Sequence, residues 1–191
     1  MKIATVLTGL VLAVAPMLFA VDVPRKAPEY VIHMTDGSQK LLSSFRGKVV
    51  VLEFGFTTCP HCQHASQLMS QLQREYGPKG FQALAVAFNP MAKMLVPDFV
   101  SEFKINFPVG FDEREPVNLF LQNPPESALH VPQLVFIDRK GIIRKQSLPR
   151  NDAETGAEAN VRKMVEQLLA EPANVPSKGK PASHKAPRKT A

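Results

Sequence analysis

The chain has 191 residues, and its 23 lysines and arginines exceed its 17 acidic residues, giving a formal charge of +6. Its 45% apolar content excludes a largely disordered chain, and two cysteines are too few for a disulfide-rich miniprotein. The excess charge lies at the two ends, since residues 172–191 hold five cations and residues 1–20 hold one, with no acid in either segment. The part between them is neutral, so the charge gives no support to nucleic-acid binding.

Residues 1–20 have the pattern of an export signal. Lys2 supplies a positive charge, residues 3–19 are almost wholly apolar, and Ala20 suits the cleavage position. The apolar stretch approaches the ~20 residues that span a bilayer, so an uncleaved segment would anchor the protein. We therefore expect a signal peptide or an N-terminal membrane anchor, with the domain in the periplasm or another oxidising extracytoplasmic space. The alternative is a buried apolar helix of the domain itself.

Residues 21–170 alternate between strand-like and helix-like patterns. Short apolar runs predict strands over Val49–Phe54, Phe81–Phe88, Phe107–Phe111, Leu134–Asp138 and Ile142–Gln146. Helical spacing of apolar residues predicts helices over Pro60–Tyr76, Pro97–Lys104 and Val161–Ala170, with a helical turn at Val117–Leu121. Arg139-Lys140-Gly141 marks a hairpin between the last two strands. This order predicts one α/β domain, a sandwich in which helices flank a mixed sheet.

Residues 171–191 contain four prolines among lysines, serines and alanines, and almost nothing to bury. Such a composition predicts a disordered basic tail. Two interpretations remain open: the tail attracts an anionic surface or an acidic partner, or it is a solvated segment without a specific role.

The two cysteines form the motif Cys59-Pro60-His61-Cys62, between the first predicted strand and the helix that begins at Pro60. A helix N-terminus offers unpaired N–H groups and the positive end of its dipole, and both stabilise a thiolate. Pro60 fits the first helical position, and a protonated His61 would add positive charge. We therefore expect Cys59 to be the attacking thiolate and Cys62, one turn inside, to be the resolving thiol.

Other uses of a cysteine pair fit this motif less well. A four-cysteine zinc site needs two more cysteines, and covalent haem needs a histidine where Gln63 stands. A structural disulfide across two residues closes too small a loop to constrain the unfolded chain much. Redox exchange is the preferred function, with metal binding and an inert pair as the alternatives.

These segments resemble the thioredoxin superfamily, and within it the exported TlpA/ResA-like thiol–disulfide oxidoreductases. The resemblance covers roughly residues 31–169 and rests on Phe45–Leu52, the cysteine motif and Val131–Asp138, in family order. It implies a three-layer thioredoxin-like sandwich and a redox disulfide between Cys59 and Cys62. It also implies protein thiols or disulfides as partners and no organic cofactor.

The resemblance also implies where a partner would be held. Pro132 corresponds to the cis-proline that faces the cysteine pair, and Val131 before it would offer backbone hydrogen bonds to an extended partner peptide. Pro60, within the motif, is the second candidate partner contact. The alternative for Pro132 is an ordinary trans-proline that opens an edge strand.

Glu53 stands six residues before Cys59, where thioredoxins carry a buried acid. Strand alternation places Glu53 on the same face as Val51, which we expect to be buried. Burial would raise the pKa of the Glu53 carboxyl and let it accept the proton of Cys62. The alternative is a carboxylate exposed at the rim of the sheet.

The sequence departs from the family at two places. Residues 55–58 replace the usual tryptophan-bearing segment before the first cysteine, which predicts different partner contacts. The dipeptide Pro60-His61 resembles strongly oxidising DsbA-type sites, in which a stabilised thiolate makes the disulfide a better oxidant. The family background suggests a reductant instead. We expect His61 to tune the potential, and the direction of electron flow stays open.

Residues 54–60 also resemble the entry to the site of the Sco-type copper proteins, which share this fold. Cys59, Cys62 and His130 would together suit Cu(I), so copper delivery is the alternative function. The two-residue spacer and Pro132 argue against it. The simpler role for His130 is that of a polar loop residue beside the site.

Two further possibilities concern residues near the motif. Met91 and Met94 are candidate soft metal ligands, although the preferred role for both is in a loop and the core. A peroxiredoxin requires a threonine three residues before its peroxidatic cysteine, and Phe56 stands there. Peroxide reduction is therefore not expected.

Overall fold

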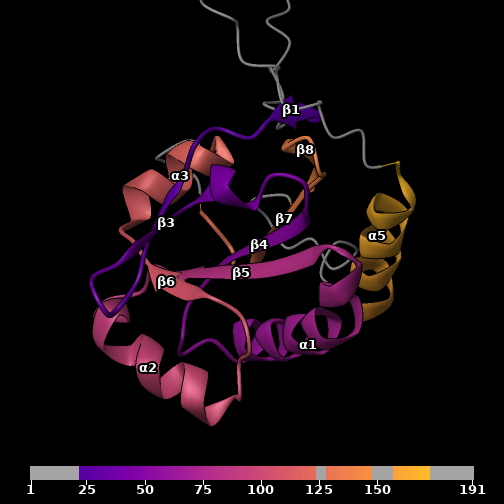
Figure 1. Cartoon of the computed structure of the whole chain (residues 1–191). Coiled ribbons are helices and arrows are strands. Elements are labelled where there is room, and N and C mark those ends of the chain that lie inside the picture. Colours follow the sequence, from indigo (N-terminus) through magenta and orange to yellow (C-terminus); the bar gives the residue numbers. More distant parts are fainter. Residues whose placement is uncertain (1–21, 124–127, 148–156, 173–191) are drawn as a thin grey trace, which may run out of the picture.

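The computed structural model describes residues 22–123, 128–147 and 157–172 (Figure 1). The expected signal segment 1–20 and nearly all of the expected tail lie outside these ranges, so both stay predictions. None of the helices in the described ranges has the length and hydropathy needed to span a bilayer.

A mixed sheet forms the centre of the described part of the chain. Its eight strands lie in the order β1-β8-β7-β4-β5-β6-β2-β3. They are β1 (Arg25–Lys26), β2 (Val31–His33), β3 (Gln39–Leu41), β4 (Val49–Gly55), β5 (Phe81–Ala87), β6 (Val109–Phe111), β7 (Gln133–Ile137) and β8 (Ile142–Gln146). β4, β5 and β6 run parallel, whereas β7 is antiparallel to β4. The C-terminal ends of β4, β5 and β6 and the N-terminal end of β7 therefore lie side by side, along one edge of the sheet.

Helices cover both faces of this sheet. They are α1 (Pro60–Tyr76), α2 (Ala92–Glu102), α3 (Arg114–Leu121) and α5 (Glu158–Ala170). Val49 and Val51 of β4 pack against α1, α2 and α5, whereas Val50, Leu52 and Phe54 pack against α3 and the N-terminal segment. Accordingly, α1 and α3 lie on opposite sides of the sheet in Figure 1. This is the three-layer sandwich that the sequence predicts.

Most of the predicted elements are confirmed, and two differences have a physical reason. α2 begins at Ala92, ahead of the predicted start, and Pro97 lies inside it at an exposed position. Strands β1 to β3 have only two or three residues each, too few to show a periodic pattern. They are held by pairing with β8, with β6 and with one another.

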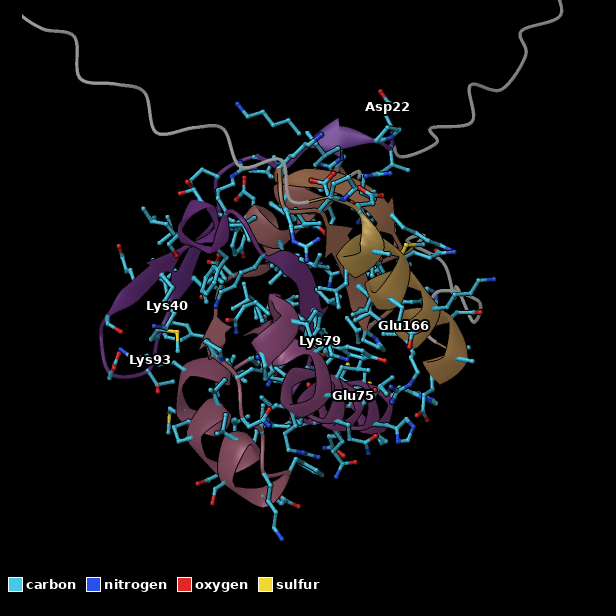
Figure 2. The ribbon with its side chains drawn as sticks, turned by 45° about the vertical axis from the view of Figure 1, so that its right-hand side comes forward. Asp22, Lys40, Glu75, Lys79, Lys93 and Glu166 are labelled. Carbon is cyan, nitrogen blue, oxygen red and sulfur yellow. The ribbon has the colours of Figure 1, made fainter. Side chains whose placement is uncertain are left out.

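Side-chain contacts fix α5 to the end of α1. The Tyr76 hydroxyl donates to Glu166 Oε1 at 2.6 Å, and Arg162 forms an ion pair with Glu75. The Lys79 ammonium lies 5.0 Å from the centre of the Tyr76 ring. Figure 2 shows Glu75 and Lys79 at this end of α1, beside Glu166 of α5. These contacts hold α5 beside α1 on the same face of the sheet.

The end of α5 is held by arginines from the hairpin. Arg139 donates to the carbonyl of Leu169 at 3.0 Å and to that of Glu171 at 2.8 Å. Arg144 of β8 pairs with the Glu171 carboxylate at 2.8 Å. Glu171, the first residue of the expected tail, is therefore bound to the domain.

Candidate active site

The two cysteines lie where β4 leads into α1. Cys59 takes the N-cap position of α1, and its carbonyl accepts the N–H of Gln63 at 3.0 Å. Cys59 is half-buried, whereas Cys62 is only 2% exposed. Both are thiols in this structure. The accessible thiol thus comes first, and the shielded one follows a turn later.

Hydrogen bonds from two elements hold the loop before Cys59. The Thr57 N–H donates to Asn89 Oδ1 at 3.0 Å, and the Asn89 side-chain amide donates back to Thr57 Oγ1 at 3.2 Å. Gln63 of α1 donates to the Thr57 carbonyl at 2.9 Å. Because Asn89 lies just past the end of β5, the loop that carries Cys59 is tied to the neighbouring strand and to its own helix.

Cys62 and Glu53 are buried beneath this loop. Glu53 is 2% exposed and accepts a hydrogen bond from Ser66 Oγ at 2.7 Å. Burial raises the pKa of the Glu53 carboxyl to about 8, and the Ser66 bond opposes that rise only in part. Burial also raises the pKa of the Cys62 thiol, and the charge of Glu53 adds to this rise. The expected burial of Glu53 is confirmed, whereas its role stays a prediction.

Gly55 lies beside both of these groups. A Cβ at residue 55 would lie 3.1 Å from Cys62 Sγ and 3.2 Å from Glu53 Oε1, closer than side-chain carbons normally approach. The lining of a cavity of about 10 Å³ includes these three residues, Phe56 and Ser66. That volume is roughly what one water molecule needs. The absence of a side chain at Gly55 thus lets the thiol and the carboxyl share one small space.

The segment before β7 reaches the same edge of the sheet. Gln133, the first residue of β7, pairs with Phe54 of β4, so Val131 and Pro132 lie at the edge where the Cys59 loop leaves β4. The Val131–Pro132 peptide bond is cis, as the family resemblance implies. Both residues are half-buried. Whether they hold a partner stays a prediction.

The remaining residues of interest are at the surface. Pro60, His61 and His130 are all exposed. Met91 and Met94 are 62% and 68% exposed, so the expectation that they contribute to the core is wrong. Their apolar character makes burial a natural prediction, but both lie in the exposed first turn of α2 or just before it.

The described residues do not assemble the copper ligand set. Within residues 22–123, 128–147 and 157–172, no three His, Cys, Asp or Glu side chains are grouped so that they could hold a metal ion. The structure therefore does not bring Cys59, Cys62 and His130 together as a three-ligand site.

Three residues of the site are missing from the sequence-based site prediction: Gly55, Ser66 and Asn89. Ser66 lies four residues after Cys62, so helical periodicity alone places both on one side of α1 and could have indicated it. Gly55 and Asn89 act through contacts between elements, which no local pattern encodes.

Replacing Glu53 with glutamine should remove a pH-dependent loss of stability. The Glu53 carboxyl has a pKa near 4.5 when unperturbed and about 8 when folded, so between these values the folded chain binds more protons. The free energy of unfolding should therefore fall as the pH rises from 4.5 to 8 and level off above. At about 1.4 kcal/mol per pKa unit, the fall amounts to a few kcal/mol.

Urea unfolding at a series of pH values measures this effect. The Glu53→Gln variant should lack most of the fall, whereas Glu102→Gln, at an exposed acid on α2, should keep it. A fall of equal size in Glu53→Gln would assign the pH dependence to another group.

Replacing Gly55 with alanine should destabilise the fold by about 1–3 kcal/mol, because the new methyl group overpacks the space shared by Cys62 and Glu53. Urea unfolding at constant pH measures the loss. Thr58→Ala, at an exposed position in the same loop, is the matched control and should change stability little. Equal stability of Gly55→Ala and the wild-type chain would show that a methyl group at residue 55 does not overpack this space.

Comparisons with known proteins identify the family. The sequence model of the AhpC/TSA family matches residues 23–146. The thiol-disulfide oxidoreductases ResA of Geobacillus thermodenitrificans and Geobacillus kaustophilus are each 31% identical over 127 residues, 66% of this chain and 69% of theirs. A crystal structure of a thiol:disulfide interchange protein of the thioredoxin family, from Chlorobium tepidum TLS, shows the same fold. The match has a TM-score of 0.64 and 23% identity, covering 78% of this chain and 99% of that one. The chain therefore belongs to the AhpC/TSA family and is a ResA-like thiol–disulfide oxidoreductase with a thioredoxin fold.

Proposed function

We propose that this protein is an exported enzyme that exchanges dithiol and disulfide with the cysteines of other proteins through Cys59 and Cys62. The observation that carries the proposal is the asymmetry of the pair. Cys59 is accessible at the start of a 17-residue helix, and Cys62 is buried beside Glu53. A two-step exchange needs one thiol that a partner can reach and a second that only the first can reach.

Cys59 carries out the first step. Cys59 stands at the N-terminal end of α1, and helix N-termini favour negative charge through the helix dipole and unpaired N–H groups. The thiolate attacks one sulfur of a partner disulfide, forms a mixed disulfide with it and releases the other partner sulfur as a thiolate. In the reverse direction, a partner thiolate attacks Cys59 in the Cys59–Cys62 disulfide and displaces Cys62. Both electrons pass between sulfur atoms, so no organic cofactor is needed.

Cys62 completes the exchange after it loses its proton. Burial keeps that proton on the thiol by raising its pKa, so a base must stand close by. Glu53, with a pKa of about 8, is partly ionised near neutral pH and accepts the proton. The Cys62 thiolate then attacks the Cys59 sulfur, the internal disulfide forms, and the partner leaves as a thiolate.

The partner backbone is received beside the cysteine pair. Val131 and Pro132 lie at the edge of the sheet from which Cys59 projects, and Val131 offers backbone hydrogen bonds to an extended partner segment. Pro60 is exposed next to Cys59 and adds a contact. His61 sets how strongly the Cys59 thiolate is stabilised and thereby the redox potential.

Export is the remaining part of the proposal. Lys2 and the apolar residues 3–19 direct the chain across a membrane, and the segment is either cleaved after Ala20 or kept as an anchor. The domain then works in the periplasm or another extracytoplasmic space, where disulfides form and persist.

Replacing Cys62 with serine should trap the mixed disulfide, since nothing remains to resolve it. The reduced full chain is mixed with a small disulfide-bonded protein, and non-reducing gels with mass spectrometry count the adducts at Cys59. Cys59→Ser should form no such adduct. A Cys62→Ser chain that is folded and captures nothing would falsify the two-step mechanism.

Replacing His61 with alanine should make the pair more reducing by about 30 mV, because the charge that a protonated His61 would place beside the thiolate is lost, and that shift corresponds to about 1.4 kcal/mol. Equilibration with glutathione buffers measures the potential. His64→Ala is the matched control, since His64 is also exposed on α1 but lies beyond the motif. Equal shifts in both variants would remove the specific role of His61.

A further inference from the structure

Met91 and Met94 form an exposed apolar pair. They are 62% and 68% exposed, and they are two of the five large apolar side chains exposed within the described ranges. The Met94 N–H donates to the Met91 carbonyl at 2.9 Å, so both belong to one turn at the start of α2. Lys93 between them extends toward β6, where its ammonium lies 5.8 Å from the centre of the Phe111 ring. The exposed side chains of Met91 and Met94 are together called the Met91/Met94 surface below.

The backbone at Met91 does not favour a methionine. Its φ of 62° and ψ of 19° lie in the left-handed region, which suits glycine or asparagine. Met91 also occupies the N-cap position of α2, and its side chain makes no capping hydrogen bond. A glycine or an asparagine would fit this backbone conformation better. A strained apolar residue that faces solvent points to a function for the side chain.

Direct hydrogen bonds tie this turn to the loop that carries Cys59. Asn89, two residues before Met91, exchanges hydrogen bonds with Thr57, two residues before Cys59. The Ala92 N–H donates to the Asn89 carbonyl at 3.0 Å, which fixes the turn to the same asparagine. β4 and β5 run parallel, so α1 and α2, which follow them, start from the same edge of the sheet (Figure 1). The hydrogen bonds between Thr57 and Asn89 place the loops that precede the two helices next to each other.

We propose that the Met91/Met94 surface is a docking site for an apolar side chain that flanks the reactive cysteine of a partner polypeptide. The inference rests on the proposed exchange with protein cysteines and names the kind of segment that is preferred. A partner sulfur that reaches Cys59 brings its neighbouring residues over the adjacent loop. Methionine suits varied apolar groups because its side chain is flexible and its sulfur polarisable. The half-buried Phe56, just after β4, packs edge-to-face on Phe88, three residues before Met91, so an apolar contact also links the two loops.

Two synthetic peptides test the docking site. Each carries one cysteine as a mixed disulfide with glutathione, and the residues around it are leucines in one peptide and serines in the other. The reduced full chain is mixed with each peptide, and acid quenching with mass spectrometry gives the rate at which the peptide's mixed disulfide is consumed as the Cys59–Cys62 disulfide forms. The wild-type chain should prefer the leucine peptide by about tenfold, the factor that corresponds to ~1.4 kcal/mol of apolar burial.

The double variant Met91→Gly/Met94→Gln should reduce that preference to within about twofold, as expected when the apolar contact is lost. Leu119→Gln is the matched control, because Leu119 is 72% exposed but lies on α3, and it should keep the full preference. An undiminished preference in the double variant would overturn the docking site alone. A wild-type chain that reacts with neither peptide would instead overturn the proposed function.

Stability gives an independent readout of the same substitution. Met91→Gly alone relieves the left-handed strain, so its urea midpoint should rise while its preference for the leucine peptide falls. A purely structural role for Met91 predicts that the midpoint and the preference fall together, and that result would overturn the inference.

Discussion

The candidate site is organised around one carboxyl group that is kept away from water. Glu53 lies in the central strand, where an ionised carboxylate without partners would be very costly. Its neighbours leave room for the carboxyl group and give it one hydrogen bond. Ser66 is the donor, Ala85 on β5 has only a methyl group, and Gly55 has no side chain. An apolar residue at this position would pack more favourably. The core is therefore weaker at this position, and the proposed role of Glu53 as the base for Cys62 would account for it.

The order of the strands brings distant segments to this carboxyl group. β4 has β5 on one side and β7 on the other, and the three contribute the loop before Cys59, the Asn89 turn and the Val131–Pro132 segment to one edge. Hydrogen bonds between Thr57 and Asn89 then join two of these segments. The site is therefore built from three segments that meet at one edge of the sheet, and not from the cysteine motif alone.

Local patterns predict what is long and periodic in this chain. β4 and α1 are recognisable because an apolar run, interrupted by Glu53, meets a helix that begins at a proline and ends before Gly77. The roles expected of the cysteine pair follow from its place at the start of that helix, whereas Glu53 is a candidate through the family resemblance and through strand alternation. β1 to β3 are too short to show a pattern, and Pro97 in α2 misleads because its ring usually opens a helix. The contacts of Gly55 with Cys62 and Glu53 depend on how a strand packs against a helix, which no local pattern reports.

The pairing of β1 with β8 has a consequence for the order of folding. Arg25 of β1 donates to Gln146 at the end of β8, a separation of 121 residues, and α5 completes the layer over α1. Such long-range contacts cannot form until nearly the whole domain is available to the chain. In a chain that emerges from its N-terminus, Cys59 and Cys62 precede the residues that bury one and frame the other. The pair is then exposed to oxidation until β5, α2 and β6, which line the space beside Cys62, have packed against β4 and α1.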